Sequence, residues 1–120
     1  MLIGEKVNGA LNEQIGYEFS ASLQYVAIAA YFETEGLTEL ADLFHQQSTE
    51  ERDHAMRFVK YVTDAGGSLK IPAIPAPRAE FTDACDAIAL SLESEQRVTQ
   101  QINSLVNLSI SEGDHITQNM

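Results

Sequence analysis

Three long stretches of the chain carry apolar residues at intervals of three, four and seven, the spacing of one face of an α-helix. The stretches cover about residues 5–35, 38–65 and 82–112. A glycine follows each of them, at Gly36, Gly66-Gly67 and Gly113, where a left-handed residue can end a helix. Long amphipathic helices bury their apolar faces against one another, so the sequence predicts an all-α helical bundle.

Residues 66–81 contain all three prolines of the chain and cannot be helical as a whole. Fully extended, such a segment spans up to about 50 Å, whereas a flanking helix would be about 42 Å long. We therefore expect a long crossover from one end of the bundle to the other. A flexible linker between two domains is the alternative, but neither half alone has enough helices to close a core. Residues 1–120 are thus expected to form one domain.

Each apolar stripe contains one glutamate, at Glu18, Glu51 and Glu95. Each has an apolar stripe residue seven positions before it and another seven after it, which places it within about 20° of both. All three lie near the middle of their helices, so they meet at one level of a bundle whatever the direction of each helix. A buried carboxylate without a partner costs several kcal/mol, so three in one core require a compensating group.

His54 follows Glu51 by three residues, and residues three apart share a helix face. A carboxylate oxygen and an imidazole nitrogen suit a first-row transition metal such as iron, and helical bundles build metal sites from glutamates and Glu-x-x-His. The pattern predicts two divalent cations bridged by Glu51. The alternative is a set of protonated carboxyls hydrogen-bonded to Tyr25 and Gln47.

The charge of the chain limits its partners. It has 18 acidic and 7 basic residues and a net charge of -11, which argues against nucleic acids and anionic membranes and permits cations. A single cysteine allows no internal disulfide, and we find no signal peptide or membrane-spanning stretch. We expect a cytoplasmic protein.

Several motifs occur in one register along the chain: Leu-Asn-Glu-Gln at residues 11–14, then Glu18 and Tyr25, then Glu50-Glu51-x-x-His54, then Glu95-Gln96. In this arrangement the chain resembles the non-haem bacterial ferritins over essentially its whole length. The resemblance implies a four-helix subunit, a cage of twenty-four subunits, and a di-iron centre. That centre would oxidise Fe(II) with dioxygen or peroxide, and Fe(III) would be stored as a mineral.

The same resemblance implies roles for particular residues. Glu18, Glu51 and His54 would hold the first iron. Glu51 and Glu95 would hold the second, and Glu50 would contribute to a third, weaker site.

By the same resemblance, Tyr25 would be the tyrosine beside the di-iron centre, or else a plain core tyrosine.

Other positions separate the ferritins from related proteins. Haem-carrying bacterioferritins are similar through Glu-x-x-His, but a methionine directly after the bridging glutamate holds their haem. Here that residue is Arg52, so we expect no haem. A rubrerythrin-like peroxidase is disfavoured because the chain lacks cysteine pairs.

Two further histidines are weaker candidates. Glu112-Gly113-Asp114-His115 is also Glu-x-x-His, but it contains a glycine expected to end the helix and lies on a different face from Glu95. We expect a solvated corner there. His45 lies off the Glu51 stripe and is expected at the surface or in an interface.

The chain ends where the fourth helix of the family begins. We therefore expect a truncated or cleaved form, or a fourth wall supplied by another subunit. Three stripes that lack a fourth wall predict self-association. Two functions remain open: an iron-oxidising storage protein, and a structural or assembly subunit with ferritin interfaces and impaired or no ferroxidase activity.

Overall fold

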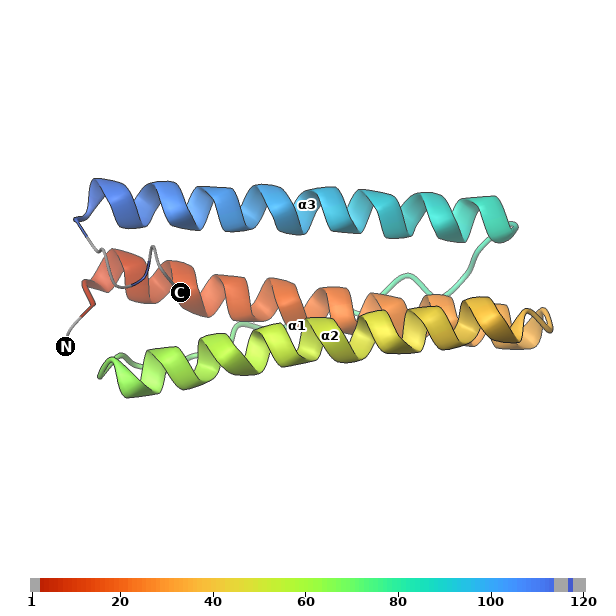
Figure 1. The fold of residues 1–120 in the computed structure, drawn as a ribbon, viewed down its shortest axis with the longest axis horizontal. Helices are drawn as coiled ribbons and strands as arrows, with labels where there is room; N and C mark the ends of the chain where they lie inside the picture. Colours follow the sequence, from red (N-terminus) through yellow and green to blue (C-terminus); the bar gives the residue numbers. More distant parts are fainter. Residues whose placement is uncertain (1–2, 114–116, 118–120) are drawn as a thin grey trace.

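The computed structural model describes residues 3–113 and Thr117, and these residues form three α-helices and no strand. They are α1 (Glu5–Thr34), α2 (Thr38–Asp64) and α3 (Ala84–Ser111). Both α2 and α3 run antiparallel to α1 (Figure 1). The predicted all-α architecture is confirmed. In the described part of the chain, no helix has the length and apolar character needed to cross a membrane.

The helix ends follow from local chemistry. Gly36, Gly66 and Gly113 have φ values of 73°, 74° and 70°, the left-handed conformation that stops a helix after its last turn. The third helical stretch is expected from about residue 82, and α3 begins at Ala84. Asp83 is the N-cap, and its carboxylate accepts the backbone N–H of Asp86 at 2.8 Å. Thr82 instead donates its backbone N–H and its hydroxyl to the Asp86 carboxylate, so it lies one position too early to cap the helix.

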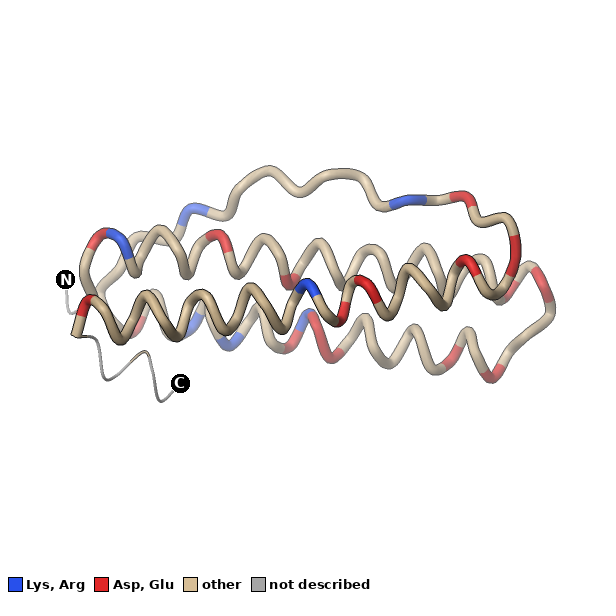
Figure 2. The backbone as a smooth tube through the Cα atoms, turned by 90° about the horizontal axis from the view of Figure 1, so that it is seen from above, with Lys and Arg blue, Asp and Glu red and all other residues tan. Residues whose placement is uncertain are grey.

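The connector between α2 and α3 crosses the length of the bundle, as predicted. Figure 2 shows it running alongside the helices. Side-chain amides of α1 hold its backbone at both ends. Asn12 donates to the carbonyl of Ser68 at 2.8 Å and accepts the N–H of Lys70 at 2.6 Å. Gln24 donates to the carbonyl of Arg78 and accepts its N–H, both at 2.9 Å.

α1 is the central helix of the three. It packs against both α2 and α3. By contrast, every Cα–Cα distance between a residue of α2 and a residue of α3 exceeds 8 Å. The predicted stripe of α1 is buried throughout: Val7, Leu11, Ile15, Glu18, Ser22, Tyr25, Ala29 and Phe32. The apolar residues form two clusters, one around Tyr25, Phe32 and Phe44 and the other around Leu11, Ile15 and Val62. Glu18 and Glu51 belong to neither cluster.

α3 buries a different face from the one predicted. Its buried residues are Ala87, Ser91, Ser94, Leu105 and Ser109. The predicted stripe is the face that carries Glu95, and two of its apolar residues, Ile88 and Leu92, are 37% and 61% exposed. The two faces are roughly a quarter of a turn apart. The physical reason is that α3 packs against α1 alone, so the apolar face turned away from α1 has no covering element among the described residues.

Candidate metal centre

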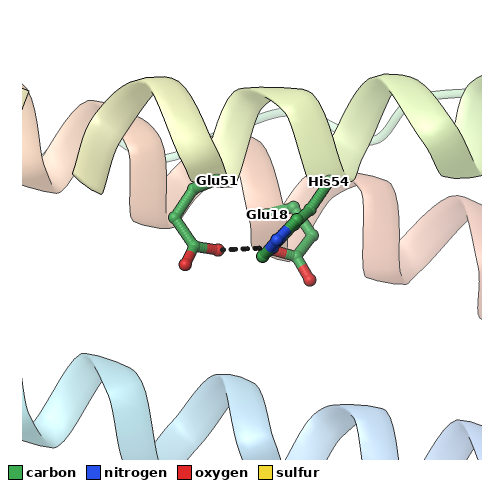
Figure 3. A group of neighbouring side chains, drawn as sticks. All are labelled: Glu18, Glu51 and His54. Atoms are coloured by element: carbon green, nitrogen blue, oxygen red, sulfur yellow. Dashed lines mark ion pairs between the residues drawn. The ribbon is translucent and has the colours of Figure 1, made fainter. Parts of the chain in front are cut away.

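Glu18 on α1 and Glu51 and His54 on α2 form a compact group, called the central group below. One potential ligand atom from each lies within 4.8 Å of the other two, and Figure 3 shows the three side chains pointing toward one another. Glu18 and Glu51 are 0% and 5% exposed, and the His54 side chain is 38% exposed. The two carboxylates are therefore removed from solvent, while the imidazole remains accessible.

One oxygen of each carboxylate has no hydrogen bond from the described residues. Oε2 of Glu18 and Oε2 of Glu51 are buried and have no hydrogen bond among the described residues. Each lies 3.7 Å from Nδ1 of His54. Unpaired buried carboxylate oxygens are costly, and two such oxygens beside an imidazole nitrogen are a donor set that suits iron. The residues present fit a divalent metal ion.

Burial also changes the acidity of this group. It raises the pKa of Glu51 to about 8. The neighbouring carboxyl of Glu18 and the negative charge of Glu95 act in the same direction, and His54 opposes them. Near neutral pH the metal-free Glu51 therefore holds a proton, which a metal ion must displace.

Glu95 does not join the central group directly. It is exposed, and the buried Tyr25 donates its hydroxyl to Oε1 of Glu95 at 2.5 Å. The structure thus brings together three of the four residues expected to converge, and links the fourth to α1 through a tyrosine. The separation follows from the packing of α3, which lies against α1 and away from α2.

Tyr25 has an environment that keeps its hydroxyl protonated. Burial raises the pKa of Tyr25 far above its ordinary value, and the hydrogen bond to Glu95 and the charges of Glu95, Glu51 and Glu18 raise it further. The phenol is therefore a hydrogen-bond donor throughout the physiological pH range. Its bond goes to Glu95, one of the three carboxyls in the alternative of protonated, hydrogen-bonded carboxyls, and not to Glu18 or Glu51.

The remaining candidates lie apart from the central group. Glu50 is exposed. His45 is also exposed, as expected, and its Nε2 lies 2.6 Å from the carboxylate of Glu33. In the second Glu-x-x-His, Glu112 is exposed, and His115 lies outside the described residues.

Sequence reasoning missed the role of Gln14, which it used only as part of a motif. Gln14 is 2% exposed, and its Nε2 donates to Oε1 of Glu18 at 3.1 Å. The available signal was its position, four residues before Glu18, where two side chains of a helix are neighbours.

Comparisons with known proteins identify relatives of this chain. A family model described as the ferritin-like domain matches residues 8–120. The ferritin BfrB of Mycolicibacterium smegmatis is 42% identical over 111 residues, which are 92% of this chain and 61% of that protein. A bacterial non-heme ferritin of Staphylococcus aureus is 31% identical over 116 residues, or 97% of this chain and 70% of that protein.

Among solved structures, an open pore ferritin from the archaeon Archaeoglobus fulgidus superposes with a TM-score of 0.94 at 34% identity. The alignment covers 98% of this chain and 72% of that one. The chain therefore spans about three fifths to three quarters of the length of these relatives.

Proposed function

Because the chain belongs to the ferritin family, we propose that it binds Fe(II) at the central group, oxidises it, and stores Fe(III) as a mineral within an oligomer. The observation that carries this proposal is the pair of buried carboxylate oxygens beside His54 that have no hydrogen bond among the described residues. A cation is the simplest partner for two carboxylates in an apolar bundle.

The proposed reaction needs two iron ions. Each Fe(II) gives up one electron, and two electrons with two protons from solvent reduce dioxygen to hydrogen peroxide or hydrogen peroxide to two waters. We assign the first iron to Glu18, Glu51 and His54, with Glu51 shared and Glu95 holding the second. Carboxylates favour the higher charge of Fe(III) over Fe(II), so they promote oxidation electrostatically. Glu50 is the proposed ligand of a third, weaker site.

In this scheme Glu51 would release a proton and Tyr25 would orient the Glu95 carboxylate. Glu51 gives up its proton when iron binds, because the same oxygens cannot hold both. Tyr25 keeps its proton and holds one oxygen of Glu95, which confines that carboxylate to the neighbourhood of the central group.

An anaerobic Fe(II) titration followed by admission of air tests this function. We expect high-affinity binding, then fast growth of the near-ultraviolet absorbance of Fe(III). Glu51→Ala should abolish the high-affinity binding, and His45→Ala, at an exposed histidine on the same helix, should not. Unchanged stoichiometry in Glu51→Ala would sink the assignment. We expect the variant to fold, because the change removes a buried polar group that has an oxygen without a hydrogen bond.

A second candidate function is a structural or assembly subunit with impaired or no ferroxidase activity. The exposure of Glu95 favours it, since a ligand of the second iron then lies outside the central group. The same titration separates the two functions. An assembled oligomer that binds no Fe(II) tightly would establish the second.

We further propose that the chain associates with copies of itself, as a ferritin cage requires, and acts in the cytoplasm without nucleic acid or membrane partners. Exposed apolar residues on α3, such as Leu92, support self-association. We propose no haem, because Arg52 follows Glu51 directly and a guanidinium does not ligate haem iron. A Soret band that survives dialysis would contradict this.

A further inference from the structure

Gln14 lies on α1 one helical turn before Glu18 and is itself almost fully buried, at 2% exposure. Its Nε2 donates to Oε1 of Glu18 at 3.1 Å. The amide NH2 group can only donate and an ionised carboxylate oxygen can only accept. The partner therefore fixes the orientation of the amide, and the amide in turn restrains the carboxylate.

This hydrogen bond makes the two oxygens of Glu18 different. Oε1 is tied to Gln14, which is on the same helix. Oε2 has no hydrogen-bond partner among the described residues and lies 3.7 Å from Nδ1 of His54. The oxygen without a partner is thus the one nearest to the imidazole of α2. Without the amide, the carboxylate could rotate and present either oxygen.

A neutral donor suits this position better than a charged one. A lysine or arginine would pair with Glu18 and cancel the negative charge that a metal ion needs. A second carboxylate would repel Glu18. An amide holds one oxygen and leaves the charge of the other available.

From this geometry we infer that Gln14 is a positioning residue of the metal centre, which acts through Glu18 by holding Oε1 so that Oε2 faces the metal ion. The inference rests on the proposed function, because it concerns the same site. Hydrogen bonds to metal ligands of this kind contribute about 10- to 100-fold to metal affinity.

Gln14→Met tests the inference, because methionine keeps the length and approximate volume of glutamine but has no N–H donor. Gln14 also lines a hollow of about 210 Å³ between α1 and α3, so the thioether has room. The probe is Co(II) added to the purified chain, so that the readout is metal binding and does not depend on oxidation by oxygen. We expect Gln14→Met to weaken Co(II) binding about 10- to 100-fold and to alter the ligand-field spectrum.

The matched control is Gln24→Met. Gln24 is on the same helix and its amide is also hydrogen-bonded, but to the backbone of Arg78. This variant should lower the melting temperature without changing Co(II) affinity. If the wild-type chain binds Co(II) and Gln14→Met binds it equally well with the same spectrum, the positioning role is wrong and the proposed function stands. If the wild-type chain binds no Co(II), both fail.

A measurement on the unmodified chain covers the case in which Gln14→Met does not fold. In ¹⁵N-correlated NMR spectra, the side-chain NH2 resonances of Gln14 should shift on addition of Zn(II), and those of Gln24 should not. Gln14 resonances that stay in place while Zn(II) binds would overturn the inference.

Discussion

At the scale of single residues, Glu51 sets how the stability of the metal-free chain depends on pH. Its pKa is raised from the ordinary 4.5 to about 8 in the folded chain, so the folded state holds a proton that the unfolded state releases. The free energy of unfolding should therefore fall as pH rises from about 4.5 to about 8. Urea unfolding in the presence of a chelator, at a series of pH values across this window, measures the effect.

Glu51→Gln is the matched variant for this prediction, because an amide has nearly the same shape and does not titrate. Its free energy of unfolding should fall less steeply over the same pH range. If wild type and variant show the same slope, the slope belongs to other groups. Metal affinity should have the opposite pH dependence and rise with pH, since metal and proton compete for Glu51.

Tyr25 offers a second test at the residue scale. Tyr25→Phe removes the hydroxyl that donates to Glu95 and leaves the buried ring in place. We expect a loss of about 1 kcal/mol of stability, because the exposed Glu95 can turn to water. Calorimetric titration with Co(II) should show a weaker second binding event and an unchanged first one.

The exposed Tyr17 provides the control, because Tyr17→Phe makes an equal chemical change away from the central group. It should alter neither binding event. Equal weakening of both events in Tyr25→Phe would mean that Tyr25 supports the fold of the whole site and not Glu95 in particular.

At the scale of elements, the attachment of the connector to α1 depends on buried amides. Asn12 is a clear case, with one hydrogen bond to Ser68 and another to Lys70. Asn12→Ala leaves the N–H of Lys70 without its acceptor. The carbonyl of Ser68 keeps only the longer bond from Asn8, at 3.2 Å. We therefore expect a loss of about 1–3 kcal/mol in the free energy of unfolding. Urea denaturation measures it, with the exposed neighbour Glu13→Ala as a control that should change stability by less than about 0.5 kcal/mol.

The elements also show how far sequence determines structure here. Helix ends were predictable because glycines such as Gly36 and Gly113 leave few alternatives at a helix terminus. The stripe of α1 was predictable because helices on two sides bury it. The buried face of α3 was not predictable, because periodicity identifies an apolar face but does not say which neighbouring element covers it.

The same distinction applies to the central group. Spacing alone placed Glu51 beside His54, and equal depth in two adjacent helices brought Glu18 to them. The position of Glu95 relative to the central group depends on the lateral distance between α2 and α3. The residue pattern of a single helix contains no information about that distance. The hydrogen bond of Gln14 depends on a rotamer, so the sequence could indicate only that Gln14 and Glu18 are neighbours.

At the scale of the whole molecule, the uncovered face of α3 predicts self-association. Leu92 is 61% exposed and Ile110 is 56% exposed, although both are large apolar side chains on a helix of this bundle. Leaving several such side chains in water forgoes several kcal/mol of hydrophobic stabilisation, at about 25 cal/mol per Å² of apolar surface. That is comparable with the whole stability of a small domain, so a monomer should be marginal.

Association with a second copy is a direct way to cover such a face, and two-fold contacts are the commonest form of it. We expect sedimentation at micromolar concentration to show an oligomer, and Leu92→Glu to shift the distribution toward smaller species. Gln100→Glu, at an exposed polar position of the same helix about 80° around its axis from Leu92, adds an equal charge and should leave the distribution unchanged. A well-folded, monodisperse wild-type monomer at that concentration would rule the prediction out, because it would mean that the apolar face of α3 tolerates water without a partner.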